Sequence, residues 1–165
     1  MHFLQREILL NQPVENIWQF MATPANLNEL TPPELNFRII SDLPETMYNG
    51  LMIEYRIGIP LFGNWRWLTE IKHIREGEYF VDEQRIGPYR LWYHQHRIEA
   101  AGNNQTHMID RVSYKLPFGV LGELVHQLRV KKMLEQIFDY RAQQLTRLFG
   151  STVPGTKDAN PKSST

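Results

Sequence analysis

Six strand-like segments follow one another along the middle of the chain, and this succession restricts the possible folds more than any other feature. Each segment is rich in β-branched and aromatic residues. The segments are LNFRIIS (35–41), LMIEYRIGI (51–59), NWRWLTEIKHI (64–74), EYFVDEQRI (78–86), YRLWYHQHRIEA (89–100) and THMIDRVSYKL (106–116). The breaks between them are rich in glycine and proline and are short, whereas parallel strands need a long crossover. The pattern therefore predicts an antiparallel meander.

Helical patterns flank this meander. HFLQREILL (2–10) predicts one more strand, and NQPVENIWQFM (11–21) and TPANLNELTPP (23–33) predict two short helices after it. From about residue 120 to 148, apolar residues recur at helical spacing, which predicts one long helix with an apolar stripe. The tail after 149 has no apolar periodicity, so we expect a single domain over 1–149 and a disordered tail over 150–165.

These elements predict an α+β fold in which a seven-stranded curved antiparallel sheet wraps around the long C-terminal helix. The helix must bury its stripe, and the sheet is the only large surface that can cover it. A curled sheet and a helix leave a gap between them, where we expect a ligand pocket.

Composition excludes several classes of protein. The chain has 165 residues, no cysteine, and equal numbers of basic and acidic residues, 18 of each. It therefore lacks the basic excess of a nucleic-acid-binding protein, and it has no thiolate for disulfides or metal ligation. MHFLQREILL is not a signal-peptide pattern, and no apolar stretch approaches the roughly 20 residues of a membrane span. We expect a cytoplasmic protein without stable membrane insertion, whose oligomeric state the sequence leaves open.

Two histidines in the fifth meander segment indicate where the polar groups of the pocket lie. A turn centred on residue 103 sets the register of the hairpin around AGNNQ (101–105). The expected cross-strand pairs are Trp92 with Tyr114, His94 with Val112, His96 with Asp110, and Ile98 with Met108. These even-numbered positions form the more apolar face, so we expect that face, with its two histidines, to be concave and buried.

Three interpretations of His94, His96 and Asp110 stay open. In the first, His96 and Asp110 form a buried cross-strand pair and His94 bonds the backbone or a tyrosine. In the second, the pair orients a carbonyl or hydroxyl of a ligand. In the third, one histidine is a general acid/base oriented by Asp110. A His-x-His pair with a carboxylate also resembles part of a zinc triad, but no further ligand is evident. We therefore expect neither a metal nor a cofactor.

Which residue of the neighbouring strand (78–86) faces the histidines depends on the length of the IGPYR turn (86–90). A three-residue loop pairs Gln84 with Trp92 and Asp82 with His94, whereas a two-residue loop presents Glu83 instead. For Asp82 and Glu83 a solvated face is the favoured interpretation. The candidate ligand-binding residues are Trp67, Gln84, Trp92, His94, His96, Asp110 and Tyr114; if the protein is an enzyme, the catalytic candidates are His94, His96 and Asp110.

Four motifs carry a resemblance to a known superfamily. They are NLNELTPPELNFRI (26–39), FVDEQRIGPYRLWYHQHRIE (80–99), MIDRVSYKLPFGVLGEL (108–124) and IFDYR (137–141). With them the chain, over residues 3–149, resembles the START-like (helix-grip) SRPBCC superfamily, and most closely its small bacterial "cyclase/dehydrase" or ligand-binding members. The resemblance implies a helix-grip fold and a cavity for a hydrophobic ligand. It implies no reaction, because this fold hosts carriers and enzymes alike.

Three functions follow as expectations. The first is a carrier or sensor of a small hydrophobic molecule, such as a lipid, an isoprenoid quinone, a polyketide or an aromatic compound. The alternative is an enzyme of the polyketide cyclase/dehydratase type that uses His94 or His96 with Asp110. The third is an interaction module whose cavity is filled by its own aromatic side chains, Trp65, Trp67, Trp92 and Tyr114.

Overall fold

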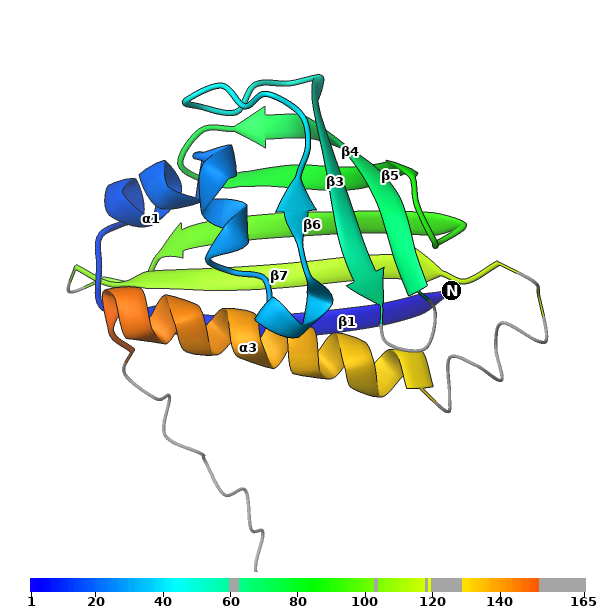
Figure 1. The fold of residues 1–165 in the computed structure, drawn as a ribbon. Helices are drawn as coiled ribbons and strands as arrows, with labels where there is room; N and C mark the ends of the chain where they lie inside the picture. Colours follow the sequence, from blue (N-terminus) through cyan, green and yellow to red (C-terminus); the bar gives the residue numbers. More distant parts are fainter. Residues whose placement is uncertain (60–62, 103, 118, 120–128, 152–165) are drawn as a thin grey trace, which may run out of the picture.

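A computed structural model shows one seven-stranded antiparallel sheet in the order β1-β7-β6-β5-β4-β3-β2 (Figure 1). It describes the chain except residues 60–62, 103, 118, 120–128 and 152–165. The strands are β1 (His2–Leu10), β2 (Arg38–Ile39), β3 (Leu51–Ile59), β4 (Gly63–Arg75), β5 (Tyr79–Ile86), β6 (Leu91–Ala100) and β7 (Thr106–Lys115). The predicted meander is confirmed over β2 to β7, and β1 joins it by pairing with β7.

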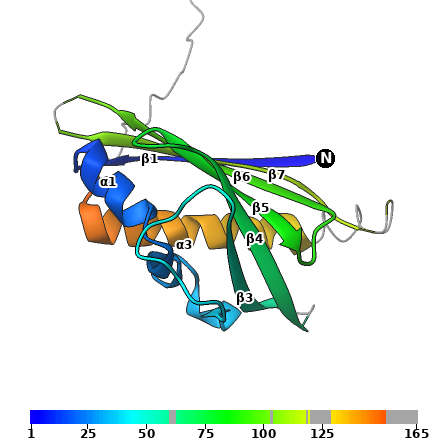
Figure 2. The same ribbon diagram turned by 90° about the horizontal axis from the view of Figure 1, so that it is seen from above.

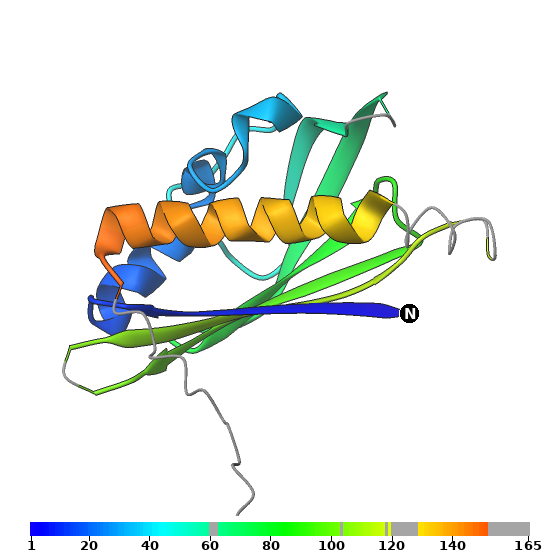
Figure 3. The ribbon, with the colours of Figure 1, turned by 90° about the horizontal axis from the view of Figure 1, so that it is seen from below.

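The helices whose bounds the structure describes lie on one side of this sheet. They are α1 (Val14–Met21), two short 3-10 helices, η1 (Pro24–Asn28) and η2 (Pro33–Leu35), and α3 (Lys131–Phe149). Figures 2 and 3 show α3 running along the sheet on the same side as α1, with β3 and β4 curling up toward the helices. The predicted architecture is confirmed, although residues 120–128 of the expected long helix lie outside the described residues.

Prolines explain why the segment after α1 differs from the single second helix that we expected. Pro24 and Pro33 each stand at the start of a separate 3-10 helix, because proline fits the first turn of a helix but not its interior. The next segment, 35–41, forms only the two-residue strand β2. At the other end, Ser151 forms a β-bridge with Leu10; the rest of the tail that we expected to be disordered lies outside the described residues.

The register of β6 and β7 matches the expected one at all four pairs. The even-numbered side chains from Trp92 to Ile98 and from Thr106 to Tyr114 are buried, whereas Arg97 and Arg111 on the opposite face are exposed. Between β5 and β6, Asp82 lies opposite His94, which is the register of the longer turn. The even-numbered face of the sheet therefore faces α3, and the two histidines point inward from it.

Burial of α3 completes the core. Leu134, Phe138 and Leu145 are buried against the sheet, at the spacing of one helical stripe. Arg141 lies on the same stripe and is only 7% exposed. Within the described part of the chain, no helix combines the length and the apolar character needed to cross a membrane.

Candidate functional site

A cavity of about 180 Å³ lies between the concave face of the sheet and the helices. Most of its wall is apolar and comes from α1, η1 and the segment after it, β3, β4 and α3, including Met21, Leu30, Ile53, Trp67 and Phe138. Its charged and imidazole groups come from three elements: β5, β6 and α3. They are Asp82, His94, His96 and Arg141. The cavity is therefore an apolar space with its ionisable groups gathered on one part of the wall.

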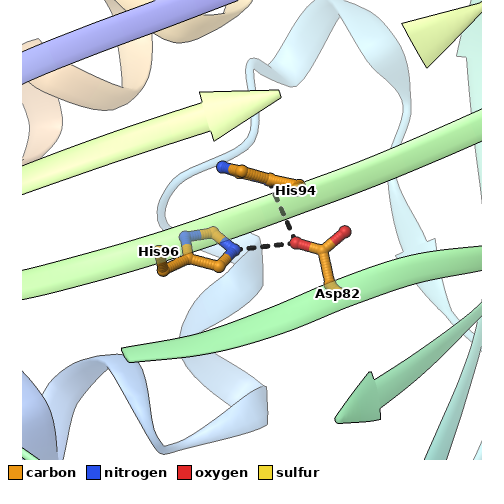
Figure 4. Close-up of side chains that lie close together, drawn as sticks. All are labelled: Asp82, His94 and His96. Carbon is orange, nitrogen blue, oxygen red and sulfur yellow. Dashed lines mark hydrogen bonds and ion pairs between the residues drawn. The ribbon is translucent and has the colours of Figure 1, made fainter. Parts of the chain in front are cut away.

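Asp82 and the two histidines form the part of this group shown in Figure 4. Oδ2 of Asp82 lies 3.0 Å from Nδ1 of His94 and 2.7 Å from Nε2 of His96. Oδ1 of the same carboxylate accepts a hydrogen bond of 3.2 Å from the indole Nε1 of Trp92. Both oxygens of Asp82 are thus held by side chains of β6.

Asp110 of β7 contacts the two imidazoles through their other nitrogens. Its Oδ1 lies 3.1 Å from Nε2 of His94 and 2.8 Å from Nδ1 of His96. Its Oδ2 accepts a hydrogen bond of 2.9 Å from Nε of Arg141, whose Nη2 also lies 3.2 Å from Nδ1 of His96. Each histidine therefore lies between two carboxylates, and Arg141 ties α3 to the same network.

The charges within this network are mutually stabilised. Burial would raise the pKa of both carboxyls, but opposite charges outweigh it: the pKa of Asp82 is lowered by the histidines, and that of Asp110 by Arg141 and the histidines. Burial would likewise lower the pKa of His94, yet Asp82 and Asp110 raise it above its usual value. The network thus keeps charged groups inside an apolar cavity.

Among the described residues, one nitrogen of the Arg141 guanidinium takes no part in this network. Its Nη2 contacts His96 and, at 3.8 Å, the sulfur of Met21. Among the residues that the structure describes, its Nη1 has no hydrogen-bond partner. Because Arg141 lines the cavity, this nitrogen is a donor that a bound molecule can use.

A second, uncharged polar group lies on β3 and β4. The hydroxyl of Tyr55 is 3.3 Å from Oγ1 of Thr69, which also accepts a hydrogen bond of 3.0 Å from Nε1 of Trp67. Burial raises the pKa of Tyr55 well above its usual value, and the negative charge of Asp82 adds to this effect. The phenol therefore stays protonated and serves as a neutral hydrogen-bonding group.

The candidate residues from the sequence fall into three groups in the structure. Trp67, Trp92, His94 and His96 line the cavity. Asp110 and Tyr114 are buried directly behind this wall, Asp110 bound to the histidines and Tyr114 packed against the rings of Trp92 and Tyr89.

Gln84 is the candidate whose side chain points elsewhere. Its amide nitrogen donates to the backbone oxygen of Tyr89 (2.6 Å), and its amide oxygen accepts from the backbone nitrogen of Tyr89 (3.1 Å). The Gly87-Pro88 turn brings this backbone within reach of the amide, so Gln84 clamps the turn and is absent from the cavity wall. Trp65 is 38% exposed, so it does not fill the cavity as the interaction-module interpretation required.

The expectation that Asp82 lies on a solvated face of the sheet was wrong. The longer turn places Asp82 opposite His94 and on the concave side, whereas Glu83 lies on the other face and forms an ion pair with Lys72. Arg141 was missed altogether. The available signal was its position on the apolar stripe of α3, three residues after Phe138 and four before Leu145.

Comparison with solved structures identifies the fold. No family model matches the sequence, and no curated protein matches it either. A START superfamily protein from Mycobacterium smegmatis superposes with a TM-score of 0.65 at 14% identity, over 90% of this chain and 99% of that chain. The Zhui aromatase/cyclase from Streptomyces sp. R1128 gives 0.61 at 9% identity, over 89% and 95%. A nucleoside-diphosphate sugar epimerase from Corynebacterium glutamicum gives 0.63 at 21% identity, over 87% of this chain and 28% of that chain.

These matches, with the curled sheet and the long C-terminal helix, define a START-like helix-grip fold. At these identities they establish the fold and not a particular activity.

Proposed function

We propose that this protein is a carrier or sensor that binds a small, mainly apolar molecule with an oxygen acceptor. The observation that carries the proposal is the composition of the cavity wall, which is mainly apolar and whose charged and imidazole groups, Asp82, His94, His96 and Arg141, gather in one place. Ligand sites typically combine an apolar lining with a few polar groups that fix orientation. The START-like fold supports the same interpretation, because its gap between sheet and helix is where the cavity lies.

The cavity volume narrows the ligand class. An apolar cavity of about 150 Å³ is large enough for benzene. The cavity here, at about 180 Å³, matches one substituted ring or a short chain better than a full-length lipid. An aromatic compound, a quinone ring or a short polyketide fits this space.

The polar groups of the cavity wall restrict the ligand class further. In the network, both nitrogens of each histidine already face carboxylates, whereas the N–H groups of Nη1 of Arg141 have no acceptor among the described residues. A carbonyl or hydroxyl oxygen of the ligand would accept from this guanidinium and satisfy it. We therefore propose that the oxygen end of the ligand lies at Arg141 and its apolar end lies toward Trp67 and Leu30.

Two measurements test this proposal. Native mass spectrometry of protein purified from its own host, followed by organic extraction, should release a small oxygen-bearing apolar compound. In addition, 1-naphthol should quench the fluorescence of Trp67 and Trp92 at lower concentration than naphthalene does, because only the naphthol carries an oxygen.

A pair of substitutions on β3 supplies the control. Ile53 lines the cavity, whereas its neighbour Met52 is exposed on the other face of the sheet. Ile53→Trp should fill the cavity and abolish naphthol binding, and Met52→Trp should leave it unchanged. Equal binding by both variants would show that the ligand lies elsewhere.

One observation favours a second function, acid/base catalysis. His94 lies in the cavity wall between two carboxylates, which orient the ring as a general acid would require. The enzyme of the cyclase/dehydratase type would then use His94 or His96 with Asp110. If His94→Gln binds a polyketide-like ketone normally but stops its conversion to product, the catalytic function replaces the carrier function.

A further inference from the structure

We propose that Asp82, His94 and His96 bind one divalent transition-metal ion at the polar wall of the cavity. This site goes beyond the apolar-ligand function and does not depend on it. Its elements are one carboxylate from β5 and two imidazoles from β6, held close together in Figure 4.

The spacing of the three ligand atoms fits such an ion. Oδ2 of Asp82, a nitrogen of His94 and a nitrogen of His96 all lie within 4.8 Å of one another. The carboxylate oxygen is 3.0 Å from Nδ1 of His94 and 2.7 Å from Nε2 of His96. Two ligand atoms at about 2.1 Å from an ion, and at right angles around it, lie about 3.0 Å apart. Two edges of the ligand triangle, from the carboxylate oxygen to each histidine, therefore match adjacent positions of an octahedron.

The opposite nitrogens of the two histidines strengthen the inference. Nε2 of His94 and Nδ1 of His96 both face Oδ1 of Asp110, at 3.1 and 2.8 Å. Histidines that bind metals typically donate their second N–H to a carboxylate in this way. With those protons on the Asp110 side, the remaining lone pairs of both rings converge on Oδ2 of Asp82. A metal ion at this point would supply the positive charge that three converging electron pairs favour.

The charge of the network is compatible with a divalent ion. Asp82 and Asp110 contribute two negative charges and Arg141 one positive charge. With both imidazoles neutral, one divalent ion brings the net charge of this group to one positive charge. Nη2 of Arg141 also lies 3.2 Å from Nδ1 of His96; because a guanidinium only donates, the proton on Nδ1 belongs to the shorter contact of 2.8 Å with Oδ1 of Asp110.

The ligand set also indicates the class of metal. Two imidazoles and one carboxylate suit Fe²⁺, Mn²⁺, Co²⁺ or Zn²⁺ rather than Ca²⁺ or Cu⁺. All three residues line the cavity, so the remaining coordination positions open into it. An oxygen of a bound molecule or a water can take those positions.

Cobalt binding by the full chain tests the site. The protein is prepared without a polyhistidine tag, stripped with EDTA and titrated with Co²⁺, with visible absorption and calorimetry as readouts. We expect one ion per chain. Asp82→Asn and His96→Gln should each weaken binding by at least tenfold, and Asp110→Asn by about 10- to 100-fold, as is usual for a residue that positions a ligand. His107→Gln is the matched control, because His107 pairs with a carboxylate, Glu7, away from the cavity.

A measurement on the unaltered protein covers the case in which a variant does not fold. Nε1 of Trp92 donates to Oδ1 of Asp82, so its indole N–H signal in a nuclear magnetic resonance spectrum should broaden or shift at one equivalent of paramagnetic Co²⁺. The signal of the half-exposed Trp65 should change less. No uptake of Co²⁺ or Zn²⁺, an unchanged Trp92 signal, or loss of binding in His107→Gln alone would each overturn the proposal.

Discussion

Arg141 is a charged residue at a position that an apolar residue would ordinarily occupy. Its guanidinium is buried against Asp110 and His96, so its removal leaves a carboxylate in the core without its cation. We expect Arg141→Met to lower the free energy of unfolding by about 3–5 kcal/mol, measured by urea denaturation. Arg141→Lys should recover only part of this loss, because lysine supplies the charge without the planar fork of donors.

Arg147 on the same helix supplies the control for that experiment. It is exposed, and its nearest acidic group, on Glu29, is 3.9 Å away. Arg147→Met should change the free energy of unfolding by less than about 0.5 kcal/mol. Similar effects of the two substitutions would contradict the role assigned to Arg141.

Buried tyrosines should make the free energy of unfolding fall as the pH rises above about 10. Burial raises the pKa of Tyr55 and of Tyr89 in the folded state above the usual value. A group of this kind stabilises the fold fully below its unfolded pKa of about 10, and the contribution is lost as the pH rises above that value. Of the seven tyrosines, we therefore expect at least these two to form tyrosinate only on unfolding, as followed by ultraviolet absorbance.

The slope of stability against pH provides a further check on this expectation. Tyr55→Phe should make the loss of stability above pH 10 less steep, whereas Tyr48→Phe should not, because Tyr48 is exposed. Complete ionisation of all tyrosines in the native protein would show that neither ring is protected.

At the residue scale, sequence reasoning found three of the five members of the charged network. His94, His96 and Asp110 were predictable, because strand parity and one hairpin register place them together. Asp82 was not, since the length of the turn after β5 decides which neighbour faces inward. Arg141 was not, because a helical stripe is usually identified from its apolar members, and pairing with a distant strand has no local signal.

At the scale of elements, neighbouring residues of α3 are buried in the core to different extents. Phe138 is buried, and its ring centre is 5.2 Å from that of His94, whereas Ile137 is only partly buried. We expect Phe138→Ala to cost about 2–5 kcal/mol and Ile137→Ala less than Phe138→Ala, in urea denaturation.

Leu148, near the end of the same helix, tests whether burial is the cause. It is 40% exposed, so Leu148→Ala should cost no more than about 0.5 kcal/mol. If all three substitutions cost the same, helix propensity rather than packing would determine their effect.

The elements themselves were predictable to different degrees. The long strands and α3 were found because alternation and helical spacing persist over many residues. The segment 23–41 was harder. Of the helix expected over 23–33 only η1 forms, and η2 begins at Pro33, where that helix was expected to end. β2 kept only two residues of the expected strand over 35–41. Short segments like these depend on tertiary contacts more than on their own pattern.

At the scale of the whole molecule, we predict that the domain ends close to Ser151. Ser151 pairs with Leu10, and the backbone oxygen of Gly150 accepts a hydrogen bond from the backbone nitrogen of Asn11. The residues that follow have no apolar periodicity in the sequence. Truncation after Ser151 should therefore leave the melting temperature and naphthol binding unchanged. A clear fall in either would show that the tail docks on the domain.

The pairing of β1 with β7 affects how this protein acquires its structure during synthesis. His2 lies opposite Tyr114, so β1, which leaves the ribosome before the other strands of this sheet, must wait for β7 before it gains its partner. Contacts between residues so distant in sequence slow folding, because the intervening chain must first be ordered. Until then β1 presents unpaired backbone groups, which are prone to pair with other chains. Protein yield in the cell should accordingly depend on chaperones that shield the emerging N-terminal segment.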